Sequence, residues 1–261
     1  MTVTKHELRQ GRAPLAIWTA SIAALMAVCI LLYPEMEADM QGVSDLFASM
    51  GAFTQAFGMD RLALGTLLGF YAVECGNVLG LGGAMFAAMT GACALSREER
   101  ERTADFLLSH PVSRVQVAVE KLTAVLLEVL AMNAVLLAVS LVCIAGIGEE
   151  IPFEELLRLH TAYLLMQAEL ACLCFGLSAV VIRGSAGAGL GIALMAYFLN
   201  LTANIADSAH ALRYVTPFAY AEGAEILESG HLDGTLILLG AVYAAAAVAA
   251  GVRHYARKDI R

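Results

Sequence analysis

The chain has 261 residues and a formal net charge of −8; 59% of its residues are hydrophobic and only 15% are charged. Soluble proteins are about 45–50% apolar, and a single soluble domain of this length could not bury the excess. The composition therefore excludes an ordinary soluble domain and indicates an integral membrane protein. Because the apolar runs are long and do not alternate with polar residues, we expect helices rather than a β-barrel.

The first apolar run, residues 14–33, follows the basic residues Lys5, Arg9 and Arg12 and superficially resembles a signal peptide. It has about the 20 residues that a full membrane span needs, and it ends without a small-residue cleavage site. We interpret it as an uncleaved first span. The preceding segment, residues 5–12, is expected to lie on the membrane surface.

Five more apolar runs follow, and together the six predict an all-α, polytopic membrane protein that forms one domain over residues 1–261. The second and third runs are longer than a helical span requires. They therefore either project beyond the membrane, or the second breaks near the glycines at 80–83. The predicted spans are residues 14–33, 62–95, 115–147, 161–182, 185–206 and 235–252.

Basic residues predict the orientation of the six spans. Only Arg61, Arg158 and Arg213 fall on one side of the arrangement, and every other Lys and Arg falls on the other side. Because cytoplasmic loops carry the excess of Lys and Arg, both termini and the loop between the second and third spans should be cytoplasmic. On the outer side, residues 36–59 have helical hydrophobic spacing, which predicts an amphipathic segment that either caps the bundle or forms an external gate.

The sequence contains no cysteine pattern and no nucleotide-binding motif that would predict a reaction or a bound cofactor in this chain. All six cysteines lie in apolar runs and are expected to be buried thiols rather than disulfides or zinc ligands. No G-x-x-x-x-G-K-[ST] loop is present, so the chain lacks that means of binding nucleotide phosphates. We therefore expect no catalytic, cofactor or metal site, and no contact with nucleic acid.

The most distinctive segment is the charged stretch between the second and third spans, residues 96–121. Ser96 and Glu99 fit a helix-starting capping box, and Pro111 disfavours helix at the residue before it. Leu107 and Leu108 provide an apolar stripe, and Ser113 can cap the following helix. The sequence thus predicts a short amphipathic helix over residues 96–110, which could rest on lipid headgroups or bind a partner.

Within this segment the sequence ERERTADFLLSHPVSR resembles the cytoplasmic signature of ABC-2 type transporter permeases, E-x-E-x-G-T-x-E-x-L-L-x-x-P-V-S-R, which is followed by a lysine, here Lys121. The departures are Arg102 in place of glycine and Asp105 in place of glutamate. The N-terminal K-x-x-L-R-x-x-R is similar to the family's surface elbow. Weaker similarities lie in Ala56-Phe57-Gly58 and in residues 214–218.

This resemblance implies a permease subunit of a prokaryotic cytoplasmic membrane that works with separate cytoplasmic ATPase subunits. ATP and Mg²⁺ would bind to the ATPase, and two copies of the permease, identical or related, would form an export path. The predicted helix would then be a coupling helix that contacts the ATPase. Its expected coupling residues are Ser96, Glu98, Glu99, Arg100, Glu101, Arg102, Thr103, Leu107, Leu108, Pro111 and Arg114.

Polar residues inside the spans are candidates for the translocation path. A charged residue at the bilayer centre costs about 2.5–3.5 kcal/mol on insertion scales, so the three intramembrane carboxylates should face protein or water. Amides at 77, 133, 167, 200 and 204 could be their partners. Alternatively, these groups form interhelical hydrogen bonds that fix the packing. The candidate path residues are Glu74, Asn77, Glu128, Glu169, Asn200 and Asn204.

The pairs Gly76/Gly80 and Gly187/Gly191 match the small-xxx-small pattern that lets helices approach closely. Either pair could form contacts within one subunit or a seam between two.

Two other function classes remain as alternatives. An intramembrane hydrolase is suggested by the sequence EELLRLH at residues 154–160, but the arginine comes one position early for an E-E-x-x-x-R site and H-E-x-x-H is absent. A secondary transporter that works alone is the second alternative. The absence of a visible inverted repeat argues against it.

Overall fold

The computed structural model describes residues 2–49, 51–97, 113–181 and 185–257. These residues form helices without a β-strand, and six of the helices are long and apolar enough to cross a membrane. The predicted all-α, polytopic architecture is therefore confirmed for the part of the chain that is described. A short helix, α1 (Thr2–Gln10), precedes the first span.

The first span is the Arg12–Met36 portion of α2 (Arg12–Ser49). The second consists of α4 (Leu67–Phe70), a π-helical turn η1 (Tyr71–Cys75) and α5 (Gly76–Cys93). The remaining spans are α8 (Arg114–Ile147), α9 (Phe153–Ser178), α10 (Ser185–Ile205) and α12 (Gly234–Arg257). Short elements between the spans are α3 (Ala52–Ala56), η2 (Asp207–Tyr214), η3 (Pro217–Ala221) and α11 (Gly223–Ser229).

Two details of the spans differ from the sequence prediction. Helix α9 begins at Phe153, well before residue 161, so Glu154 and Glu155 form its first turn, where negative charge interacts favourably with the helix dipole. The second span is not broken at the glycines 80–83, because α5 runs through them without interruption. Its irregular turn is instead the π-helix η1, which lies closer to the start of the span.

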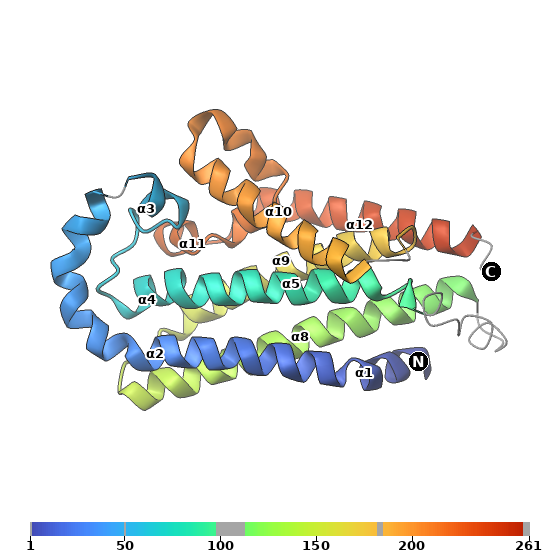
Figure 1. Cartoon of the computed structure of the whole chain (residues 1–261), viewed down its shortest axis with the longest axis horizontal. Coiled ribbons are helices and arrows are strands. Elements are labelled where there is room, and N and C mark those ends of the chain that lie inside the picture. Colours follow the sequence, from blue (N-terminus) through green and yellow to red (C-terminus); the bar gives the residue numbers. More distant parts are fainter. Residues whose placement is uncertain (1, 50, 98–112, 182–184, 258–261) are drawn as a thin grey trace.

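The outer segment predicted over residues 36–59 is helical over its first part, because α2 continues past the membrane span to Ser49. Pro34 lies inside α2, and a proline there removes a backbone hydrogen bond and bends a helix. Figure 1 shows the C-terminal part of α2 turning away from the bundle axis at the end that carries α3 and α11.

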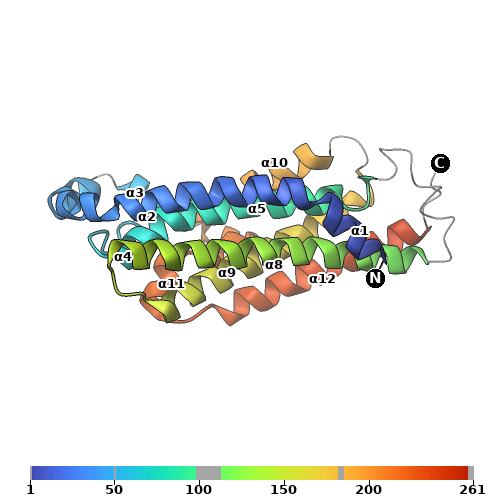
Figure 2. The same cartoon turned by 90° about the horizontal axis from the view of Figure 1, so that it is seen from below.

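The two ends of the bundle carry different elements. Figures 1 and 2 both place α1, the C-terminal end of α12 and the start of α8 at one end, and α3, α4 and α11 at the other. We call the first the α1 end and the second the α3 end. An even number of spans returns the chain to the side on which it started, so both termini belong to the α1 end.

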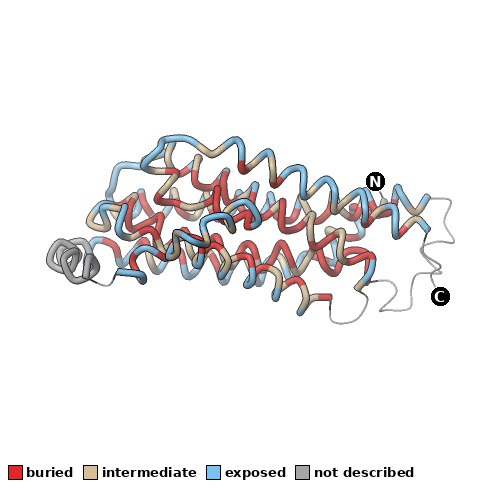
Figure 3. Tube along the Cα trace, turned by 90° about the horizontal axis from the view of Figure 1, so that it is seen from above, coloured by how far each residue is buried: buried red, intermediate tan, exposed pale blue. Residues whose placement is uncertain are grey.

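Helices α5 and α9 form the centre of the bundle. Over the apolar stretch of each span, 61% of the residues are buried in the span that contains α5 and 56% in α9. The corresponding fraction is 17% in the span of α2 and 17% in α12. Figure 3 shows buried residues along the interior and exposed residues along the outer helices. The exposed outer positions include large apolar side chains such as Leu25, Val142 and Leu238, as expected for helices that contact lipid.

Glycines allow the central helices to approach until backbone meets backbone. A Cβ atom at Gly91 of α5 would lie 2.3 Å from the carbonyl oxygen of Ala171 in α9. A Cβ at Gly189 of α10 would lie 2.5 Å from the carbonyl oxygen of Ala88. Small residues at helix contacts are the usual means of close packing in membranes, and here they join α5 to α9 and α10.

This packing predicts opposite outcomes for two glycine substitutions. Gly91→Ala forces a methyl group into the backbone of α9 and should lower the free energy of unfolding by about 1–3 kcal/mol. Gly146→Ala in α8 meets no atom within 4 Å and should be neutral or stabilise by up to about 1 kcal/mol. Thermal unfolding of both purified variants in one detergent measures the difference, and equal stabilities would contradict the close approach of α5 and α9.

Candidate functional site

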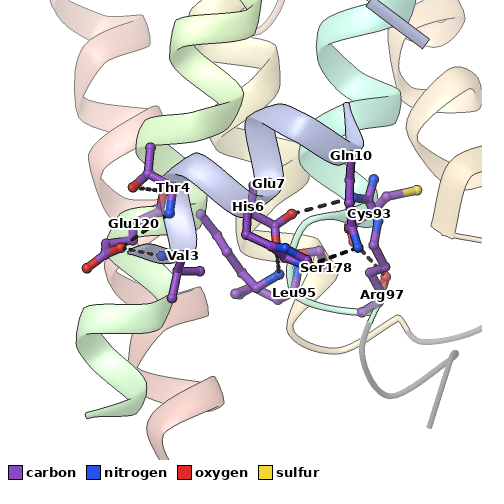
Figure 4. Close-up of polar contacts among 12 residues, drawn as sticks. Val3, Thr4, His6, Glu7, Gln10, Cys93, Leu95, Arg97, Glu120 and Ser178 are labelled. Carbon is purple, nitrogen blue, oxygen red and sulfur yellow. Dashed lines mark hydrogen bonds and ion pairs between the residues drawn. The ribbon is translucent and has the colours of Figure 1, made fainter. Parts of the chain in front are cut away.

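Helix α1 is attached to α8 through its N-terminus (Figure 4). The carboxylate of Glu120 accepts hydrogen bonds from the backbone N–H groups of Val3 (3.0 Å) and Thr4 (3.2 Å). The Thr4 hydroxyl donates to the carbonyl oxygen of Glu120 at 3.1 Å. The first N–H groups of a helix have no partner within it, and a carboxylate there is also favoured by the helix dipole. A side chain of α8 thus caps α1.

One turn further along α1, Glu7 bridges two cations, Lys121 in α8 and Arg97 shortly after α5. Its Oε1 accepts from Lys121 Nζ at 2.7 Å, and its Oε2 lies 3.4 Å from Arg97 Nη1. Glu7 is 8% exposed and Lys121 only 1%. Gln10 reinforces the contact, because Arg97 Nη1 also donates to its Oε1 at 3.2 Å. We call Glu7, Gln10, Arg97, Glu120 and Lys121 the anchor.

The anchor holds both flanks of the predicted coupling segment. Arg97 directly precedes residues 98–112, and Lys121 lies close to the start of α8, which follows them. Both cations bind the same carboxylate of α1. The two ion pairs therefore join α1, the residue that follows the second span at Arg97, and α8.

Most of the predicted coupling residues lie outside the described residues, and so does nearly all of the predicted helix over 96–110. Those outside are Glu98, Glu99, Arg100, Glu101, Arg102, Thr103, Leu107, Leu108 and Pro111. Arg114 is the first residue of α8, and Ser113 caps this helix as predicted by accepting from Gln116 N at 3.1 Å.

Ser96, the first predicted coupling residue, is buried in the bundle rather than placed on its surface. Its hydroxyl donates to Ser185 Oγ at 3.1 Å, and the neighbouring Leu95 N–H donates to Ser178 Oγ at 3.3 Å. The end of the second span is thus hydrogen-bonded to the last residue of α9 and the first residue of α10.

At the α3 end, a half-open cavity of about 60 Å³ lies between η1, α5, α9, α10 and η3. It brings together three of the predicted path residues, Asn77, Asn200 and Asn204. The rest of the lining consists of glycine, alanine and leucine together with one acidic and four aromatic residues. The acidic and aromatic residues are Glu222, Tyr163, Tyr197, Phe57 and Phe218. We call this space the outer cavity.

The three amides of the outer cavity differ in their partners. Asn77 Oδ1 accepts from the Tyr197 hydroxyl at 3.1 Å, and Asn204 Nδ2 donates to the Ala56 carbonyl oxygen at 3.3 Å. Asn200 is 8% exposed, and its Oδ1 has no hydrogen-bond partner among the described residues. The cavity wall therefore contains a buried acceptor that no group in the described part of the chain satisfies.

The three intramembrane carboxylates do not line the outer cavity. Glu169 accepts from the Tyr220 hydroxyl at 2.8 Å and lies against Gly240 of α12. Glu128 lies against Gly11, the residue between α1 and α2, and so belongs to the α1 end. Glu74 is half-buried in η1. The predicted path residues thus divide into one set of three amides and three separate carboxylates.

Two of the amides named as partners for these carboxylates bind each other instead. Asn133 Nδ2 donates to Gln167 Oε1 at 2.7 Å, and Gln167 Nε2 donates to the Leu79 carbonyl oxygen at 3.2 Å. The amide of Gln167 fills the space where Gly83 lacks a side chain. These bonds join α8, α9 and α5, which agrees with the packing interpretation for this pair.

Sequence reasoning missed several residues of both sites. Glu7 is the only acidic residue before Glu35, within a basic segment, and this isolation was a usable signal. The two ion pairs of Glu7 join residues that are 90 and 114 positions apart in the sequence, so they left no local pattern. Tyr163, Tyr197 and Glu222 of the outer cavity could not be distinguished from ordinary core or loop residues.

These features define a multi-pass membrane protein with an anchored segment at one end and a polar cavity at the other. A sequence model of the family described as ABC-2 family transporter protein matches residues 1–260. The chain therefore belongs to the ABC-2 transporter family, as the signature in residues 99–114 indicated. A comparison with curated protein sequences gave no significant match.

The anchor predicts a large effect for a small substitution. Glu7→Gln removes the negative charge that faces Lys121 and Arg97, and the loss of a charged partner from a buried hydrogen bond destabilises a protein by about 1–3 kcal/mol or more. We expect a correspondingly lower midpoint of thermal unfolding for the purified variant. Glu149→Gln, an exposed position between α8 and α9, is the control and should change stability by less than about 0.5 kcal/mol.

The double variant Glu7→Gln/Lys121→Gln tests the pairing itself. Because both charges are then absent, its loss of stability should be smaller than the sum of the two single losses, by about 0.5–3 kcal/mol. Strictly additive losses would show that Glu7 and Lys121 do not stabilise each other.

Proposed function

We propose that this chain is the membrane permease subunit of an ABC-2 type transporter of a prokaryotic cytoplasmic membrane. ATP, with Mg²⁺, is hydrolysed by a separate cytoplasmic ATPase, and the permease moves its substrate outward. Membership of the ABC-2 transporter family supports the permease role. The observation that carries the partnership is the anchor, in which one carboxylate binds both flanks of the segment that resembles a coupling helix.

The anchor suits the transmission of force. Removing one partner of a buried ion pair is strongly unfavourable, so Glu7, Arg97 and Lys121 should stay together while the protein moves. An ATPase that pulls on residues 98–112 then displaces α1, the end of the second span and α8 as one body. Leu107 and Leu108 would provide the apolar contact with the ATPase, and the charged residues around them its polar rim.

The proposed orientation places the α1 end in the cytoplasm. The excess of Lys and Arg around both termini and residues 96–121 supports it. The α3 end, with its acidic loops and the outer cavity, then faces outward. Two copies of the bundle, identical or related, would form the complete path, and the amides of the outer cavity would contribute to it.

Co-purification with the ATPase tests the partnership. The variant Leu107→Asp/Leu108→Asp places two charges in the proposed apolar contact. We expect loss of the complex and of permease-stimulated ATP hydrolysis, with the thermal unfolding of the permease itself unchanged.

Ile151→Asp/Phe153→Asp is the matched control, since it makes the same change at two exposed apolar residues at the other end of the bundle, one between α8 and α9 and one at the first position of α9. This control should retain the complex. A Leu107/Leu108 variant that still assembles and stimulates the ATPase would contradict the docking role.

A further inference from the structure

Glu222 is the carboxylate of the outer cavity, and it differs from the other acidic residues beside it. Glu225 forms an ion pair with Arg213, and Glu228 forms one with Arg61. Glu222 has no ion pair within the described part of the chain, and it lines the cavity. An unpaired carboxylate in a recess is a site that a cation can neutralise.

The wall beside Glu222 depends on a glycine. Gly58 has φ +67°, a conformation that other residues rarely adopt. A Cβ atom there would lie 2.7 Å from Ala224 Cβ and 3.4 Å from Glu222 Oε1. The absence of a side chain at Gly58 therefore lets the chain after α3 close over the carboxylate.

The other walls provide oxygen acceptors. Asn200 Oδ1 is buried without a partner among the residues described, and Asn77 Oδ1 accepts from Tyr197. The π-helical turn η1 directly precedes Gly76 and Asn77 of the lining, and such turns are frequent at functional sites. The cavity thus combines one carboxylate with amide oxygens that can accept N–H donors.

Aromatic rings complete the lining. Tyr197 and Phe218 meet edge to face, with ring centroids 5.5 Å apart, and Phe57 and Tyr163 also contribute. Aromatic faces attract organic cations. The volume of about 60 Å³ is several times the roughly 10–15 Å³ that a cavity needs, on the same kind of measure, to hold one water molecule. This space suits an ammonium head group, whose hydrocarbon part would extend through the open side.

We propose that the outer cavity binds the ammonium group of an organic cation, with Glu222 as its counter-ion. Asn200 and Asn77 accept N–H donors of this group, and the aromatic rings contact its carbon atoms. The inference rests on the proposed function in one respect, since the bound cation is then the class of molecule that the transporter moves. A metal ion fits less well, because the described residues contain no group of three or more His, Cys, Asp or Glu side chains that could hold one.

The site should also respond to pH. Burial is the main cause that raises the pKa of Glu222, and the negative charge of Glu225 acts in the same direction. The positive charges of Arg213 and Arg61 and a hydrogen bond from Asn204 oppose this shift. Since only the ionised carboxylate attracts a cation, affinity should fall as the pH is lowered through this raised pKa. Conversely, a bound ammonium ion should lower the pKa of Glu222.

Calorimetric titration of n-butylammonium into the permease subunit in nanodiscs of zwitterionic lipid, without ATPase or nucleotide, tests the proposal. The wild-type protein should bind, and Glu222→Gln should weaken binding by about tenfold or more, since a charge-assisted hydrogen bond is lost. Glu228→Gln is the same change at an exposed, ion-paired residue of α11, the helix that Glu222 directly precedes, and Glu228 does not line the cavity; this variant should retain affinity within about twofold.

A second variant keeps the test independent of any folding defect. Glu222→Gln/Asn200→Asp returns a carboxylate to the same cavity, at a position whose oxygen has no hydrogen-bond partner among the described residues, and it should restore much of the lost affinity. The proposal is overturned if wild-type protein does not bind n-butylammonium, or if Glu222→Gln binds it as well as wild type. Equal binding of neutral butan-1-ol, or equal competition by Na⁺, would likewise overturn it.

Failure of this proposal is distinguishable from failure of the proposed function. The titration contains no ATPase, so loss of docking through Leu107 and Leu108 leaves cation binding unchanged. Conversely, if n-butylammonium does not bind, the complex with the ATPase and its stimulated hydrolysis remain as evidence for the permease role.

Discussion

The carboxylate of Glu7, held between Arg97 and Lys121, is the interaction on which the α1 end of the molecule depends. Taking three charged groups out of water is costly, and the arrangement is favourable only while all three stay in contact. Exposed ion pairs contribute little to stability, whereas separating α1, the second span and α8 here would cost the free energy of leaving buried charges apart. Because these charges are buried, their ion pairs should hold the three elements together when one of them moves.

Helix α5, at the centre of the bundle, extends from the region of the anchor to the outer cavity. Helix α5 begins at Gly76 and Asn77 in the cavity wall and ends at Cys93, close to the anchor. It is one of the two most buried spans and touches α9 at Gly91 without an intervening side chain. Closely packed helices shift as rods rather than deform. A displacement of the anchor is therefore expected to reach the cavity.

Sequence reasoning predicted what local physics determines. Hydropathy located six spans because lipid requires long apolar helices, and the cap at Ser113 followed from a rule that involves only neighbouring residues. The start of α9 was placed too late because Glu154 and Glu155 count against a span, although their position in its first turn is favourable. Glu7 was missed because its partners are distant in sequence.

Glycine patterns show the same limit. The pairs Gly76/Gly80 and Gly187/Gly191 match the small-xxx-small pattern equally well, yet their surroundings differ. Gly76 and Gly80 face Tyr163 at the cavity, whereas Cβ atoms at Gly187 and Gly191 would meet nothing within 4 Å. Which face of a helix meets another is decided by the packing of the whole bundle. The most direct test of the account is a distance between two spin labels, one at Arg9→Cys in α1 and one at Val119→Cys in α8. The labels are placed on a background without the native cysteines, and the distance is measured in the ATPase complex with and without ATP. The account predicts an unchanged distance in both states, and a change of several ångströms would contradict the anchor as a rigid connection.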